Sequence, residues 1–84
     1  MLDSGAMSDT LLDVQGLNCP LPVLKANKAL RGLEPGARLT VLATDRAALK
    51  DFPAFCAETG HRLLAATEEA GGVLRFVLEK RASP

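Results

Sequence analysis

The chain has 84 residues, and its ten Lys and Arg balance its ten Asp and Glu, so the formal net charge is zero. This length allows one small domain, and the charge balance provides no global attraction to nucleic acid or to an anionic membrane. Trp and Tyr are absent and only three Phe are present, which leaves few surfaces for stacking single-stranded bases. We therefore expect protein partners that are recognised locally, with no direct nucleic-acid or membrane binding.

Hydropathy and cysteine content bear on the compartment. No apolar run approaches the roughly 20 residues of a membrane-spanning helix, and the N-terminus lacks a basic region followed by an apolar stretch. We therefore expect a cytoplasmic protein. In a reducing compartment its two cysteines should be free thiols. Two Cys and one His are too few for a structural zinc site, so we expect no metal.

The two ends of the chain read as flanking segments. A second methionine, Met7, suggests that the preceding residues are an expression remnant or a mis-assigned start. We expect residues 1–10 to be a disordered extension or such a remnant, residues 11–81 to form the domain, and residues 82–84 to be a short tail.

The first half of the domain reads as strand, helix and strand. Residues 11–16 alternate as a short strand that ends in Gly16. Apolar residues then recur at helical intervals from Pro20 to about Leu33, and Gly32 with the Pro35-Gly36 pair ends this helix. Residues 38–44 form a largely apolar strand that suits the interior of a sheet.

The second half reads as a helical region followed by a hairpin. We expect Asp45 to cap a short turn, and the main second helix to start near Asp51 and Pro53 and to end at Gly60. Residues 61–69 and 73–81 then form an antiparallel hairpin around Ala70-Gly71-Gly72.

The resulting βαβαββ order predicts an α/β (α+β) fold, a two-layer sandwich of a mixed four-stranded sheet with both helices on one face. A crossover connection makes the first two strands parallel. The turn after the first strand then lies at the C-terminal edge of the sheet, where open α/β folds commonly present functional groups. Cys19 lies in that turn.

The segment GLNCPLPVL, residues 16–24, carries the chemistry. Pro20 suits the first position of a helix, which would leave Cys19 at or beside the N-cap. Backbone N–H groups and the helix dipole there predict a thiol pKa below its ordinary value, modestly so because Pro22 removes one N–H donor. Pro22 also occupies the second cysteine position of a Cys-x-x-Cys motif. A sulfur species on Cys19 would therefore persist until a partner arrives.

Basic residues follow on the same helix. Lys25, Lys28 and Arg31 could hold an anionic sulfur species or contact an acidic partner surface. A solvated helix face is the more common explanation for each of them. On the strand side of the loop, Asp13 and Gly16 read as structural turn residues.

The second cysteine has a separate interpretation. Cys56 shares a helical face with Phe52 and Phe55, and a buried free cysteine behaves as a small apolar side chain. We expect it in the core, the alternative being that it resolves Cys19 or accepts its sulfur. We expect His61 on the surface and assign it no role.

Two segments carry a resemblance to a known family. They are residues 13–22, with the pattern Asp-x-x-Gly-x-x-Cys-Pro-x-Pro, and residues 51–56, with the pattern Asp-x-Pro-x-Phe-Cys. The chain resembles the TusA-like (SirA/TusA) sulfur carrier proteins from about Leu11 to Arg81. The resemblance implies a two-layer α/β sandwich in which Cys19 carries sulfane sulfur as a persulfide, without another cofactor, while Pro20 and Pro22 shape its loop.

The resemblance also implies partners. As a sulfurtransferase, the chain would receive sulfur from a cysteine desulfurase, a rhodanese or a DsrE-like protein. It would pass that sulfur to an acceptor protein in tRNA thiolation, molybdenum cofactor sulfur supply or dissimilatory sulfur oxidation. We expect a monomer that forms transient complexes.

Two other functions remain open from the residues alone. One is a non-catalytic regulatory or protein-binding module that uses the Cys-Pro-x-Pro loop as a recognition surface. The other is a thiol redox or peroxide-reducing protein, which the missing second motif cysteine disfavours.

Overall fold

The computed structural model describes residues 9–82. Its elements in chain order are β1 (Asp9–Asp13), α1 (Leu21–Arg31), β2 (Arg38–Ala43), α2 (Ala48–Thr59), β3 (Arg62–Glu68), the short 3-10 turn η2 (Ala70–Gly72) and β4 (Leu74–Glu79). This is the predicted βαβαββ order. The first strand includes Asp9 and Thr10, which we had placed in the N-terminal extension, while residues 1–8 and 83–84 lie outside the described residues.

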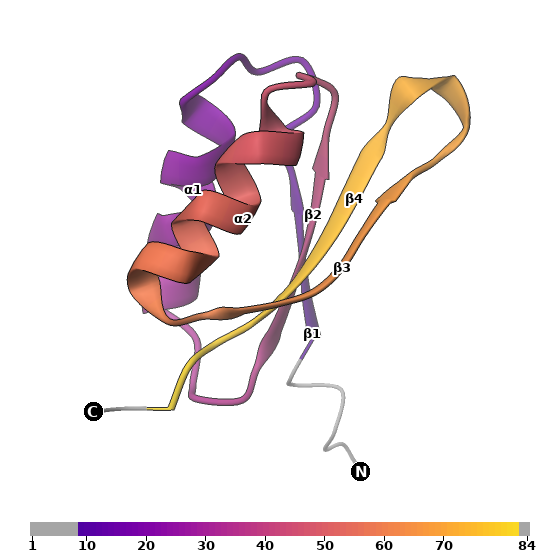
Figure 1. Cartoon of the computed structure of the whole chain (residues 1–84). Coiled ribbons are helices and arrows are strands. Elements are labelled where there is room, and N and C mark those ends of the chain that lie inside the picture. Colours follow the sequence, from indigo (N-terminus) through magenta and orange to yellow (C-terminus); the bar gives the residue numbers. More distant parts are fainter. Residues whose placement is uncertain (1–8, 83–84) are drawn as a thin grey trace, which may run out of the picture.

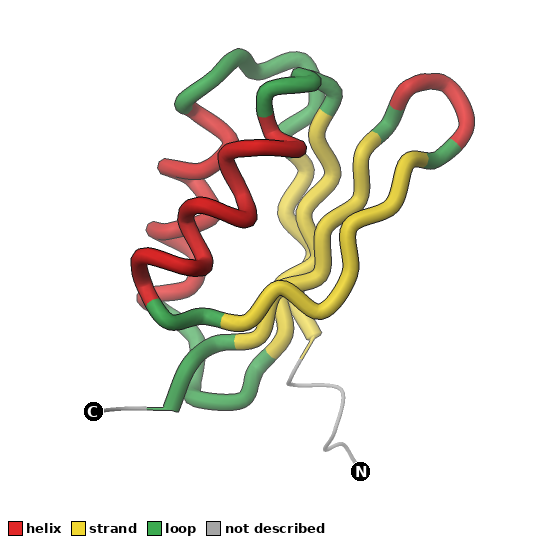
Figure 2. Tube along the Cα trace, in the orientation of Figure 1, coloured by secondary structure: helices red, strands yellow, loops and turns green. Residues whose placement is uncertain are grey.

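The four strands form one mixed sheet in the order β1-β2-β4-β3. Strands β1 and β2 are parallel, whereas β4 pairs antiparallel with both β2 and β3. Both helices cover the same face of this sheet (Figures 1 and 2). The predicted two-layer α+β sandwich is therefore confirmed.

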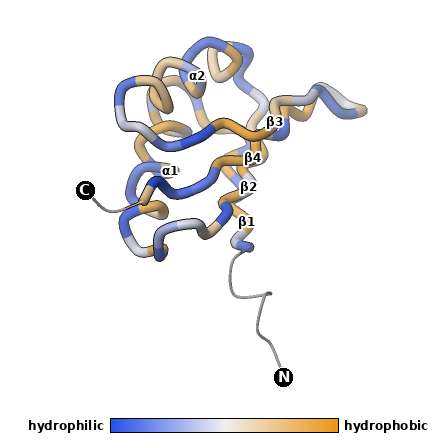
Figure 3. The backbone as a smooth tube through the Cα atoms, turned by 60° about the horizontal axis from the view of Figure 1, so that its bottom comes forward, coloured by the Kyte–Doolittle hydropathy of each residue, from blue (hydrophilic) through white to orange (hydrophobic). Residues whose placement is uncertain are grey.

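The core lies between the helices and the inner face of the two central strands. Alternate residues of β2 and β4 are buried there, with partners from both helices. At its centre the rings of Phe52 and Phe76 stack with centroids 4.6 Å apart, and neither side chain is exposed. Hydrophilic and hydrophobic stretches alternate along both helices (Figure 3), as expected for helices that bury one side.

The starts of both helices differ from the prediction. Pro20, predicted as the first helical residue of α1, is its N-cap, and Pro22 is its second residue; Cys19 therefore lies beside the cap, the outer of its two predicted places. Helix α2 begins at Ala48 and continues through Pro53, so the expected start near Asp51 is wrong. The earlier start is favoured because it buries Ala48 with Phe52 on the core side, while Pro53 faces solvent.

Helix α2 ends as predicted. Gly60 adopts the left-handed conformation with φ of 86°, and its N–H donates to the Cys56 carbonyl. The chain can then turn directly into β3, because glycine adopts positive φ without steric cost.

Candidate functional site

A tight loop connects β1 to α1 at the C-terminal edge of the two parallel strands. Gly16 has a φ of 83°, and its N–H donates to Thr44 Oγ1 at 2.8 Å. The Asp13 carboxylate accepts the N–H of Gln15 at 3.0 Å. Asp13 therefore contacts the backbone of the turn, and Gly16 contacts the side chain of Thr44, which follows β2. The contacts of both predicted turn residues are structural.

Asp45 positions the backbone of Cys19. The Cys19 N–H donates to Asp45 Oδ2 at 2.7 Å, and the other carboxylate oxygen of Asp45 accepts the Ala47 N–H at 3.0 Å. One side chain therefore joins the cysteine loop to the turn that starts α2. The Cys19–Pro20 peptide bond is cis, and the thiol of Cys19 is exposed.

Acidic groups surround the Cys19 thiol and change the sign of its predicted pKa shift. Asp51, whose carboxylate favours the protonated thiol as a hydrogen-bond acceptor, raises the Cys19 pKa most; desolvation and the negative charges of Asp51 and Asp45 raise it further. The expected lowering of the pKa is wrong. Its physical basis was the helix N-terminus, but Cys19 lies before the N-cap and faces carboxylates on the α2 side.

An open depression of about 230 Å³ lies beside Cys19, between the two helices. Its other lining residues are Pro20, Val23, Asp51, Ala54, Phe55 and Glu58. We call it the Cys19 groove. Apolar side chains dominate its surface, and the two charged residues that line it, Asp51 and Glu58, are both acidic.

The basic residues of α1 are not part of this groove. Lys25, Lys28 and Arg31 are exposed, and none of them lines the Cys19 groove. Arg31 instead lines a depression shared with His61, Lys80 and other residues. The predicted cationic contact for a sulfur anion is therefore not assembled at Cys19 in this structure.

Cys56 lies in the core, as predicted. Its side chain is 6% exposed, and burial raises the pKa of its thiol. Both cysteines are free. His61 is partly exposed and its Nδ1 accepts the Arg81 N–H at 3.0 Å, so its contact is structural.

Sequence reasoning did not assign Asp45, Asp51 or Glu58 to the site. Two signals could have found them. Asp45 follows β2, and the carboxyl ends of parallel neighbours such as β1 and β2 meet at one edge of a sheet. Asp51, Phe55 and Glu58 have the spacing that places side chains on one side of a helix.

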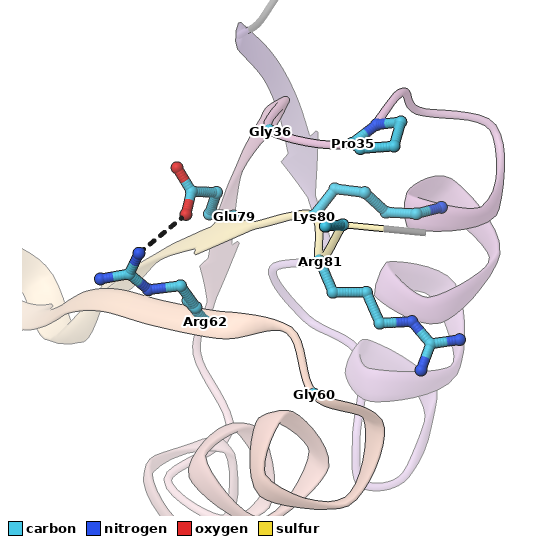
Figure 4. Close-up of a pocket in the computed structure, with 8 residues that line it drawn as sticks. Pro35, Gly36, Gly60, Arg62, Glu79, Lys80 and Arg81 are labelled. Carbon is cyan, nitrogen blue, oxygen red and sulfur yellow. Dashed lines mark ion pairs between the residues drawn. The ribbon is translucent and has the colours of Figure 1, made fainter. Parts of the chain in front are cut away.

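A second depression lies at the opposite end of the helices and is lined by Gly36, Gly60, Arg62 at the start of β3, and the basic residues Lys80 and Arg81 that follow β4 (Figure 4). Arg62 pairs with Glu79 at 3.5 Å. Lys80 donates to the Leu30 carbonyl and Arg81 to the Thr59 carbonyl at 2.8 Å. Lys80 and Arg81 thus satisfy C-terminal carbonyls of both helices, and no cysteine lines this depression.

Within residues 9–82, no group of three or more His, Cys, Asp or Glu could hold a metal ion. No described helix is long and apolar enough to cross a membrane.

Fold and site together define a class: small two-layer α+β proteins that display one exposed cysteine in a Cys-Pro-x-Pro loop at the edge of the sheet. Comparison with known proteins identifies the family. The family model described as Sulfurtransferase TusA matches residues 10–80. The chain belongs to the TusA family and is a sulfur carrier protein.

Individual relatives agree with this assignment. A Neisseria meningitidis protein is 57% identical over 75 residues, which are 89% of this chain and 100% of the relative. The sulfur carrier protein TusA of Allochromatium vinosum is 47% identical over 72 residues, which are 86% of this chain and 93% of the relative. The crystal structure of a SirA-like protein from Desulfitobacterium hafniense has a TM-score of 0.76 and 28% identity, and the match covers 84% of this chain and 96% of that one.

Proposed function

We propose that Cys19 carries the sulfur, held covalently as a persulfide, and that the chain acts as a sulfurtransferase between a donor protein and an acceptor protein. The observation that supports this most is the contrast between the two cysteines. The Cys19 thiol is exposed on a hydrogen-bonded loop, whereas Cys56 is buried in the core. A partner protein can therefore reach Cys19 without unfolding the domain.

The loading step exchanges one sulfur–sulfur bond for another. The sulfur of Cys19 attacks the outer sulfur of a donor persulfide, and a bond forms between these two atoms. The bond inside the donor persulfide breaks, and the donor cysteine leaves with the electron pair and takes up the proton that Cys19 releases. No external oxidant or reductant is needed. Attack of an acceptor thiolate on the outer sulfur of the Cys19 persulfide returns the carrier to its starting state.

The absence of a neighbouring thiol at Cys19 favours storage of this sulfur. Pro22 occupies the position of the second cysteine in a Cys-x-x-Cys motif, and Cys56 lies in the core. Rapid reduction of the persulfide by an internal cysteine is therefore disfavoured, because thiol exchange requires access of a thiolate to the sulfur. Release then depends on a thiol that a partner brings.

We propose a cysteine desulfurase, a rhodanese or a DsrE-like protein as the donor. The acceptor would be a protein of tRNA thiolation, of molybdenum cofactor sulfur supply or of dissimilatory sulfur oxidation. We also propose a cytoplasmic monomer with transient complexes, since two free cysteines suit a reducing compartment.

Intact-protein mass spectrometry tests the carrier site. The reduced protein is incubated with a cysteine desulfurase and L-cysteine, or with a rhodanese and thiosulfate. We expect the addition of sulfur that dithiothreitol removes. Cys19→Ser should abolish the addition, whereas Cys56→Ala, a matched removal of the buried thiol, should retain it.

Two outcomes would contradict the proposal. Retention of removable sulfur in the folded Cys19→Ser variant would place the carrier site elsewhere. Failure of every donor to load wild-type protein whose Cys19 is readily alkylated would favour a regulatory or binding module.

A further inference from the structure

Exposed apolar side chains gather at the end of the helices that carries Cys19. Leu21 and Leu24 on the first turn of α1 are 44% and 54% exposed, and Leu49 on the first turn of α2 is 40% exposed. The Cys19 groove lies between these helices, with Val23 and Phe55 among its lining residues. Clustered exposed apolar groups are typical of surfaces that bind another protein.

The charges of the Cys19 groove have one sign. Asp51 and Glu58 line it, and no Lys or Arg does. Among the described residues, the ion pairs are Arg46 with Glu68 and Arg62 with Glu79, so neither groove carboxylate forms an ion pair there. Glu58 also lines the neighbouring depression that contains Arg31 and Arg81, whereas Asp51 does not. The two carboxylates lie about two helical turns apart along α2. Such a surface complements a cation that lies next to an apolar side chain.

We propose that the Cys19 groove receives a segment of the sulfur donor or acceptor that places an Arg or Lys side chain between Asp51 and Glu58, and that this cation frees Cys19 from Asp51. The segment's neighbouring apolar side chain would pack on Phe55. This inference rests on the proposed role of Cys19 and adds the chemistry by which a partner is recognised.

The contacts of Cys19 explain why a cation would activate it. In the unbound carrier, Asp51 and Cys19 line the same groove, and the carboxylates of Asp51 and Asp45 raise the Cys19 pKa. From the α1 side, the groove is lined by Pro20 and Val23, which carry no charge. A cation bound to Asp51 neutralises the nearest negative charge and competes for its oxygens. The thiolate is then favoured only in the complex.

The consequence for the carrier is selectivity. In the carrier without bound sulfur, the Cys19 thiol remains protonated until a partner with the matching cation docks. It is therefore less reactive toward electrophiles other than the partner. The bonds formed and broken in the sulfur-transfer step are the same as in the loading step described above, because docking changes only how readily Cys19 loses its proton.

Thiol reagents of different charge test the groove without any sulfur donor. The reduced protein reacts with two methanethiosulfonate reagents, one bearing a trimethylammonium group and one a sulfonate group. We expect Cys19 to prefer the cationic reagent more than a small free thiol does. Asp51→Asn and Glu58→Gln should each reduce this preference about two- to fivefold, the effect of one exposed ion pair, while Glu34→Gln, which removes an exposed carboxylate outside the groove, should retain it.

The neutral reagent iodoacetamide distinguishes activation of the Cys19 thiol from electrostatic attraction of a charged reagent to the groove. Asp51→Asn should increase the alkylation rate near neutral pH, because the group that raises the Cys19 pKa most is removed. Glu58→Gln should leave this rate unchanged, since Glu58 is not among the groups that raise the Cys19 pKa.

Short peptides test recognition of the combined cation and apolar group. Two peptides carry cysteine as a mixed disulfide with thionitrobenzoate, followed by Arg-Leu in one and Glu-Leu in the other. Wild-type protein should release thionitrobenzoate faster from the Arg peptide, and Glu58→Gln should narrow the difference. Equal peptide rates, or a reagent preference no greater than that of a free thiol, would overturn the groove proposal. Persulfide loading by a donor, measured separately, would still decide the carrier site.

Discussion

The two ends of the helix layer use charge in opposite ways. At the end that carries Cys19, Asp51 lines an open groove and forms no ion pair with a Lys or Arg among the described residues. At the other end, Lys80 and Arg81 donate to the terminal carbonyls of α1 and α2. The larger depression in Figure 4 is therefore built from charges that already serve the fold. Charges without internal partners are the ones available to another protein.

The largest expected effect comes from a substitution in the core that holds both ends of the helix layer in place. Phe52 is fully buried and stacks on Phe76. Phe52→Ala should lower the free energy of unfolding by about 3–5 kcal/mol, a large part of the total for a small domain. Urea unfolding followed by circular dichroism measures this. Leu64→Ala, at a side chain that is 40% exposed, should change it by less than about 0.5 kcal/mol; similar losses in both variants would contradict the assigned core.

A smaller effect tests whether the basic end is purely structural. Lys80 donates to the last turn of α1, so Lys80→Met should lower the free energy of unfolding by about 1–2 kcal/mol, because a charged hydrogen bond and a favourable helix-dipole interaction are lost. The iodoacetamide rate of Cys19 should stay at the wild-type value. Lys25→Met, which removes an exposed cation from the same helix, is the matched control and should be near neutral in both assays. A changed alkylation rate in Lys80→Met would show that the two ends are coupled.

The smallest effect concerns the junction between the cysteine loop and α2. Hydrogen bonds from the N–H groups of Cys19 and Ala47 lower the pKa of Asp45. Because the folded pKa is below the ordinary value of 3.8, the charged form of Asp45 stabilises the fold above that pH, and this stabilisation is lost as the pH falls through the folded pKa. Asp45→Asn should therefore be less stable than wild type at neutral pH, and the two should converge in acid.

Asp45→Asn should also speed alkylation of Cys19, but less than Asp51→Asn does, because Asp45 contributes less than Asp51 to the raised Cys19 pKa. Urea unfolding as a function of pH, and iodoacetamide kinetics near neutral pH, measure the two effects. A stability difference that is constant from neutral pH to acid would contradict the role of the Asp45 charge.

Most of the fold was predictable because its signals are local. The alternation of residues within 73–81 predicted a strand there, and Leu74, Phe76 and Leu78 of β4 are fully buried. The helical spacing of apolar residues from Pro20 to about Leu33 predicted α1 in the same way, and Ala26 and Leu30 of that helix are buried. The start of α2 was not predictable from Pro53, because burial of Ala48 and Phe52 extends the helix one turn earlier than the proline signal suggests.

The same distinction between local and long-range signals applies to the candidate site. The amino-acid sequence by itself determined that Cys19 lies in a proline-restricted loop after a parallel strand, since strand periodicity and proline chemistry act over a few neighbouring residues. The sign of the Cys19 pKa shift was decided by tertiary structure, which brings Asp45 and Asp51 to the thiol from 26 or more positions along the chain. Electrostatic interaction depends on distance in space, so packing of α2 against α1 outweighs the local helix start.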